Sequence, residues 1–255
     1  MAEQKKNLQN GAEHLEDRRL KLMIAGGGAL LAAAMLLAVV LLGGDSRIRR
    51  AAPPAKDDRE AARRIDAAMR RRRTPRQAVP EPVDLAIPAG TTAIAPRACA
   101  GRLDLRSVVI PEGVTTIGEG AFEGCENLRS VTIPASVTTI GDYAFSWCSN
   151  LTEIVLPPHL AAVGEGTFSY CLRLRGVKLP AEVASVGTFA FAYCYALTEI
   201  KLPDRVTGVG DFAFAYCWGL GNVELPAQIS AIGKHAFFSC PCEAQLRKRF
   251  PKLFR

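Results

Sequence analysis

Eight cysteines in a chain of 255 residues point first to metal binding or disulfide formation. Zinc sites need converging ligand pairs, such as two Cys-x2-Cys pairs, and the sequence contains no such set. If cysteines of adjacent repeats stack at the spacing of neighbouring strands, the distance between their Cα atoms lies within the range of a disulfide, so bonding between them is possible. Small buried thiols that fill core space explain the regular placement better, and the sequence leaves open whether Cys240 and Cys242 are bonded. Six cysteines recur every 23 residues: Cys125, Cys148, Cys171, Cys194, Cys217 and Cys240.

The three histidines do not form a catalytic set. His14 lies near the start of the chain, and His159 and His235 fall at different positions of a repeating pattern. No Ser/His/Asp arrangement, HExxH motif or phosphate-binding loop occurs. Residues 208–213 imitate part of a dinucleotide fingerprint, but no βαβ unit surrounds them. The sequence therefore predicts no enzyme, no cofactor and no metal.

A 23-residue pattern fills the C-terminal two-thirds of the chain and must position the six regularly spaced cysteines, His159 and His235. A fixed period of this length is typical of a solenoid, in which each unit buries its apolar face against its neighbours. Three series of residues recur at this spacing, and one of them is the cysteine series given above. The second is an apolar-Pro pair, whose prolines are Pro88, Pro111, Pro134, Pro157, Pro180, Pro203 and Pro226. The third is a phenylalanine series, which comprises Phe122, Phe145, Phe168, Phe191, Phe214 and Phe237.

Each unit predicts two short strands and a compact return. Residues 130–133 alternate polar and apolar side chains, which is the period of a half-buried strand, and Pro134 should end it because proline cannot donate to a ladder. A second extended piece follows over 137–140, and Gly141 permits a tight turn. The stretch 142–148 fits a turn or one or two turns of helix.

The two ends of the repeat array depart from the pattern. Cys99 replaces the expected phenylalanine and Arg102 the expected cysteine in the first unit, as is typical of a terminal capping coil. After the last unit, residues 243–249 predict a short helix that covers the final coil, with Leu246, Phe250 and Phe254 on its buried side.

The repeat resembles the BspA-like leucine-rich repeat family. The residues that carry the resemblance are Leu128, Val131, Ile133-Pro134, Val137, Ile140-Gly141, Ala144-Phe145 and Cys148, with their equivalents in the other coils. The resemblance implies a leucine-rich-repeat solenoid of seven coils, built of short strands with turns or short helices, over residues 85–242, followed by a C-terminal cap at 243–255. It also implies a surface protein that binds other proteins, and it transfers no catalytic residue.

The front of the chain predicts a membrane anchor. Residues 22–42 are 21 residues without a charge, long enough as a helix to cross bilayer hydrocarbon. A cleaved signal peptide and a buried helix are the alternatives, but no Ala-x-Ala site follows. We favour a single-pass signal anchor after a short N-terminal tail at 1–21. Because basic residues flank both sides almost equally, only the family resemblance places the repeats outside the cytoplasm.

The segment 43–84 is a basic linker rich in proline and arginine. Between Asp45 and Arg76 it carries twelve Lys or Arg against five acids, and this difference of +7 equals the formal net charge of the chain. A solvated spacer is the simplest interpretation, and contact with anionic headgroups is the alternative. No nucleic-acid-binding motif accompanies the charge, so nucleic acid is not an expected partner.

Two outward surfaces are candidates for binding a partner protein. Tyrosine and tryptophan dominate interface hot spots, and they cluster beside the cysteine series, where Tyr170 and Tyr193 are expected on a ridge that is more exposed than the phenylalanines. Charged residues vary along the strand face. The candidate residues are Trp147, Tyr170, Tyr193, Tyr195, Tyr216 and Trp218 in the aromatic stripe, and Glu153, Lys178, Glu199 and Lys201 on the strand face.

The sequence thus predicts a membrane-anchored surface protein with an adhesion-type, protein-binding solenoid. One alternative is a structural rod or spacer with no specific ligand. Another is carbohydrate binding through the aromatic stripe, because aromatic rings are the feature that exceeds what the core needs. The ligand and the oligomeric state are not encoded in any motif.

Overall fold

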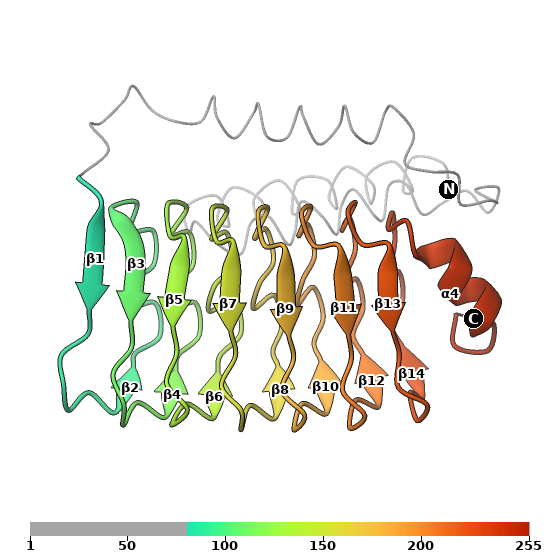
Figure 1. The fold of residues 1–255 in the computed structure, drawn as a ribbon, viewed down its shortest axis with the longest axis horizontal. Coiled ribbons are helices and arrows are strands. Elements are labelled where there is room, and N and C mark those ends of the chain that lie inside the picture. The colour runs from blue at the N-terminus through green and yellow to red at the C-terminus, as the bar shows by residue number, and fades with distance from the viewer. Residues whose placement is uncertain (1–80, 255) are drawn as a thin grey trace, which may run out of the picture. The chain divides into compact units, whose positions relative to one another are not determined.

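The computed structural model describes residues 81–254, which form a parallel β-solenoid of about seven coils (Figure 1). The predicted tail, the span at 22–42 and most of the basic linker lie outside the described residues. Within residues 81–254, no helix has the length and apolar character needed to cross a membrane. The solenoid begins with β1 at Val83, two residues before the predicted boundary.

Two ladders of parallel strands form two sides of the solenoid. Their registers advance by 23 residues per coil, so that Ser107 lies opposite Ser130 and Glu199 opposite Asn222. The first ladder contains β1 (Val83–Ala86), β3 (Leu105–Val109), β5 (Ser130–Thr132), β7 (Glu153–Val155), β9 (Gly176–Lys178), β11 (Glu199–Lys201) and β13 (Asn222–Glu224). The second contains β2 (Ala93–Ile94), β4 (Thr116–Ile117), β6 (Thr139–Ile140), β8 (Ala162–Val163), β10 (Ser185–Val186), β12 (Gly208–Val209) and β14 (Ala231–Ile232).

Turns, and not helices, form the third side of each coil. In the stretch 142–148, Tyr143 and Trp147 adopt left-handed φ angles of 57° and 62°. Alternate backbone N–H groups then point along the solenoid and donate to the next coil, with Tyr143 bonded to Glu165 O at 2.8 Å, Phe145 to Thr167 O and Trp147 to Ser169 O. This arrangement satisfies backbone groups that an α-helix would have paired within the coil.

The glycine after the second strand is required for close packing between coils. The expected turn begins at Gly141, whose carbonyl accepts from Ala144 N at 3.3 Å, but Gly141 itself does not have a positive φ. A Cβ added to Gly141 would lie 2.6 Å from the backbone nitrogen of Glu119 in the preceding coil. Glycine is therefore needed because the backbones of successive coils approach each other at this point.

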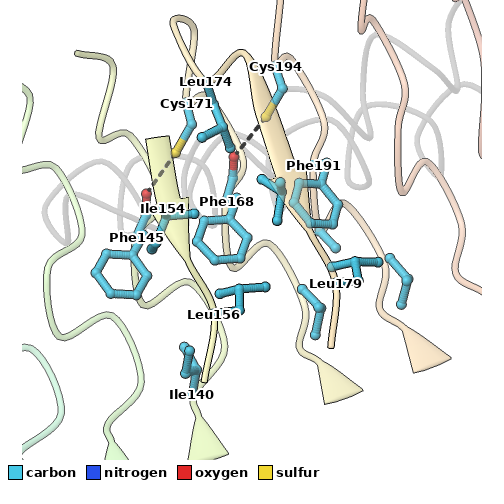
Figure 2. Close-up of a cluster of buried hydrophobic side chains, with 14 of the residues drawn as sticks. Ile140, Phe145, Ile154, Leu156, Phe168, Cys171, Leu174, Leu179, Phe191 and Cys194 are labelled. Carbon is cyan, nitrogen blue, oxygen red and sulfur yellow. Dashed lines mark hydrogen bonds between the residues drawn. The ribbon is translucent and has the colours of Figure 1, made fainter. Parts of the chain in front are cut away.

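Stacked side chains fill the interior as one continuous core. The six phenylalanines lie face to face with ring centroids 5.2–5.7 Å apart, and Figure 2 shows three of them between leucine and isoleucine side chains. The described members of this core belong to residues 85–254 and form one cluster along the solenoid.

The two ends of the described solenoid differ in structure. In the first coil, Arg106 on β3 forms an ion pair with Asp84 on β1, and the pKa of Asp84 falls to about 2 because Arg106 bonds its carboxylate. At the other end, α4 (Glu243–Arg249) covers the last coil (Figure 1). Its Leu246 is buried, and the Phe254 ring lies 6.3 Å from the ring of Phe237.

Candidate binding surfaces

The cysteine series bonds successive coils through thiol hydrogen bonds. Each Sγ donates to a backbone carbonyl of the previous coil 26 residues earlier, such as Cys171 to Phe145 O and Cys194 to Phe168 O at 3.3 and 3.2 Å (Figure 2). The same bond recurs from Cys125, Cys148, Cys217 and Cys240. All eight cysteines, Cys240 and Cys242 included, are free thiols in the structure, and residues 81–254 hold no group of three or more metal-ligating side chains close enough to bind a metal.

Burial of these thiols makes alkaline pH destabilising. Burial raises the pKa of Cys125 from 9.0 to about 12 and those of Cys148 and Cys171 well above 9.0. A group whose pKa is higher in the folded state contributes its full stability below the unfolded pKa and loses it as pH rises toward the folded value. The solenoid should therefore lose stability from about pH 9 upward.

Above about pH 9, each thiol should lower the free energy of unfolding by up to about 1.4 kcal/mol per pH unit. Urea unfolding at about pH 8 and about pH 10.5 measures the effect. The free energy of unfolding of Cys171→Ala should fall less steeply with pH than that of the wild type, and the difference should equal the contribution of one thiol. Equal slopes for the two proteins would show that Cys171 does not titrate in this way.

The aromatic stripe is a column of rings stacked face to face between coils. Trp147 and Tyr170 have centroids 3.8 Å apart, Tyr170 and Tyr193 4.4 Å, and Tyr193 and Tyr216 4.6 Å. Tyr170 is only 5% exposed, so the expected exposed ridge is wrong at this residue, while Trp147, Tyr193 and Tyr216 are half-buried. Tyr170 therefore belongs to the packing between coils, and the other three also present an edge to solvent.

These rings occupy backbone positions that favour glycine. Trp147, Tyr170, Tyr193 and Tyr216 all have φ between 60° and 63°, whereas Gly124 occupies the equivalent position of an earlier coil. A non-glycine residue in this region costs about 1–2 kcal/mol. The stacking must offset that cost, so the rings contribute to the solenoid as well as to its surface.

Tyr195 and Trp218 form a second, half-buried stack outside this column. Their rings are nearly parallel, with centroids 4.3 Å apart, and Tyr195 meets Tyr193 edge to face at 6.2 Å. Tyr195 precedes β11 by only four residues, which places this pair where the turn side meets the first strand ladder. Tyr193, Tyr195, Tyr216 and Trp218 are called the aromatic corner below.

The strand face places all four predicted charged residues in solvent. Glu153, Lys178, Glu199 and Lys201 are exposed on β7, β9 and β11, and Lys201 forms an ion pair with Glu224 on β13 at 3.0 Å. Val155 lies on the same face and is 78% exposed. The alternation of residues 153–155 predicts this outward direction.

The two described histidines remain apart, as their different repeat positions predict. His159 Nδ1 lies 3.1 Å from Glu182 Oε1 on the surface. His235 stacks on Phe212 at 5.1 Å.

Solved structures of leucine-rich repeat proteins share this fold. One from T. pallidum is 31% identical over 68% of this chain and 83% of its own, with a TM-score of 0.64. One from Bacteroides ovatus is 36% identical over 52% of this chain and 37% of its own (TM-score 0.51), and one from Eubacterium ventriosum is 25% identical over 62% and 43% (TM-score 0.57). This chain thus spans less than half of the last two proteins. No curated protein matches it in sequence.

The sequence model of the BspA type leucine rich repeat region matches six copies, over residues 83–196 and 162–243. Proteins of this family and fold are generally not enzymes, and the solved relatives are consistent with a protein-binding or scaffold role. Since the match extends over well more than half of the 255 residues, the chain belongs to the BspA type leucine-rich repeat family.

Proposed function

We propose that this protein is a membrane-anchored surface protein whose solenoid binds a partner protein by adhesion-type contacts. The observation that carries the proposal is the aromatic corner, a rigid cluster of half-buried Tyr and Trp rings beside an exposed, charged strand ladder. Such rings supply most of the binding energy in protein interfaces.

The corner is organised in advance of binding. Its rings are held by stacking at 4.3–4.6 Å, so little side-chain entropy remains to be lost when a partner arrives. The four rings are half-buried, so part of their apolar area faces solvent, which suits the contact surface of a protein interface. The inward positions repeat from coil to coil, whereas the outward ones differ, as in solenoids that use one face for recognition.

The strand face contributes charge beside this corner. Glu199 and Lys201 lie on β11, directly after the segment that contains Tyr195, and Glu153 and Lys178 extend the pattern over the two preceding coils. Charges at the rim of an interface direct encounter and exclude wrong partners more than they increase affinity. A partner with the complementary pattern of charge is therefore expected.

Capture experiments with residues 77–255 test the binding function. The solenoid should capture a specific surface protein, and Tyr195→Ala and Trp218→Ala should each weaken that binding by about 2 kcal/mol, or about 30-fold. His159→Ala is the matched control, since His159 is an exposed ring away from the corner. Melting of each variant should show that the fold is retained.

The alternatives give different results in the same experiment. A structural rod would capture nothing specifically. Carbohydrate binding would appear as capture of glycans, and not of proteins, with the same dependence on Tyr195 and Trp218. If both alanine variants still capture the protein, the binding surface lies instead on the strand face, at Glu153, Lys178, Glu199 and Lys201.

Anchoring rests on the sequence of residues 22–42 and is tested separately. Protease treatment of intact cells should release a fragment that contains the repeats, and the mature N-terminus should precede residue 22. A mature N-terminus after residue 42 would indicate a cleaved signal peptide. Full protection from the protease would place the repeats inside the cell.

A further inference from the structure

The segment that caps the last coil is strongly basic, and most of its charge has no structural task. Between Glu243 and Phe254 the sequence has four basic residues, Arg247, Lys248, Arg249 and Lys252, against the single acid Glu243. All four basic residues are exposed. The charge is therefore concentrated at one end of a solenoid whose other described surfaces mix both signs.

One of the four residues holds the cap together. Arg247 bonds the Glu243 carboxylate from Nε and Nη2 at 2.9 Å, and its guanidinium lies 5.2 Å from the centre of the Phe254 ring. Its Nη1 also donates to Phe254 O at 3.4 Å. Arg247 thus fastens the end of the segment to α4 and is not available as a free cation.

The other three residues form a basic patch, defined here as Lys248, Arg249 and Lys252. None of the three has a carboxylate partner among the described ion pairs, and the guanidinium of Arg249 lies 5.2 Å from the ring of Phe250. The apolar side chains of the same segment, Phe250, Leu253 and Phe254, are half-buried and pack against the core, so the basic groups are what the cap presents to solvent.

We infer that this basic patch binds an anionic phospholipid surface. Exposed basic side chains held together on a folded cap suit an anionic bilayer surface, where the cations meet lipid phosphates. The surface is distinct from the aromatic corner and from the strand face, and the inference does not depend on either of them. It concerns the end of the described solenoid opposite to β1, so it adds a second contact to any anchoring through residues 22–42.

Vesicle binding by residues 81–255 tests the inference, because this part contains the described core and lacks both the predicted span and most of the basic linker. Cooperative thermal unfolding of the fragment and equal vesicle binding by the full chain show that the fragment is folded. Vesicles of phosphatidylcholine with about one-third phosphatidylglycerol should bind it, and pure phosphatidylcholine vesicles should not. Each basic residue near an anionic surface contributes about 1 kcal/mol. The triple variant Lys248→Gln/Arg249→Gln/Lys252→Gln should therefore bind on the order of 100-fold more weakly, and added salt should weaken the wild type.

The matched control removes the same charge from the coils. Arg129→Gln/Arg173→Gln/Arg175→Gln changes three exposed basic residues outside the cap and should retain most of the vesicle binding, and unchanged melting temperatures show that both triple variants fold. An equal loss in the two variants would mean that net charge alone drives binding and would overturn the inference. Duplex DNA of mixed sequence that competes fully with the vesicles would identify a general polyanion surface and would also overturn it.

Discussion

Replacing Phe168 with alanine should lower the free energy of unfolding by about 3–5 kcal/mol, the range for deleting a large buried aromatic side chain. Phe168 is fully buried, and its ring stacks between Phe145 at 5.7 Å and Phe191 at 5.3 Å. The coils above and below are fixed by backbone hydrogen bonds on three sides, so they cannot collapse into the space. Urea unfolding followed by circular dichroism measures the change.

Val155→Ala is the control for this effect. Val155 is 78% exposed on β7, close in sequence to Phe168 but outside the core, so its truncation should change stability by less than about 0.5 kcal/mol. A loss below about 1 kcal/mol for Phe168→Ala would contradict a continuous ring stack. Tyr170→Ala should fall nearer to Phe168→Ala than to Val155→Ala, because Tyr170 is buried between two rings.

Gly210→Ala should be nearly as damaging, at about 3 kcal/mol, through overpacking of one backbone against another. A Cβ at Gly210 would lie 2.6 Å from the carbonyl carbon of Gly187 and would also contact the backbone nitrogen of Thr188. Both are main-chain atoms of the preceding coil, so no side chain can turn away to make room. Thermal and urea unfolding of the variant give the magnitude.

Gly176→Ala is the matched control and should have the opposite sign. Gly176 begins β9, has no positive φ, and an added Cβ would meet nothing within 4 Å. Alanine should stabilise the protein here by about 0.5–1 kcal/mol, because glycine within a strand loses more chain entropy on folding. If both substitutions destabilise equally, close approach between coils is not the reason for the glycine at position 210.

The strands and caps were predictable from local pattern, because the same constraints act in every coil. Proline ends each strand of the first ladder, and the register follows from the 23-residue spacing. The helix at Glu243–Arg249 and the burial of Leu246 also agree with the prediction. In these places the hydrophobic period, proline chemistry and capping all favour one structure.

The turn side was less predictable because contacts between coils override the preferences of single residues. Tyrosine and tryptophan disfavour a positive φ, so the local sequence around Tyr143 and Trp147 also fits a turn of helix, although both residues adopt a positive φ. Hydrogen bonds and ring stacking with the next coil select the left-handed backbone instead. A signal was present, since Gly120 and Gly124 occupy the same positions one coil earlier, and glycine alternating with other residues at one repeat position indicates a positive φ.

The composition of the candidate site does not reveal which of its aromatic rings are exposed and which are buried. The sequence identifies a stripe of Tyr and Trp, but it does not reveal that Tyr170 lies below the surface while Tyr195 and Trp218 remain half-buried. Likewise, the period places the cysteines in the core, but only the structure reveals that their thiols donate to phenylalanine carbonyls. Exposure and bond direction arise from how adjacent coils meet.

The direction of the hydrogen bonds between coils has a mechanical consequence. These bonds run along the solenoid axis, so a pulling force applied between the two ends would load the bonds of one coil at a time and peel coils off in sequence. Among the described residues β1 pairs only with β3, whereas α4 protects the other end, so the first described coil is the weakest point. Each detached coil would release 23 residues, or about 80 Å of extended chain, so the domain would lengthen in steps under tension.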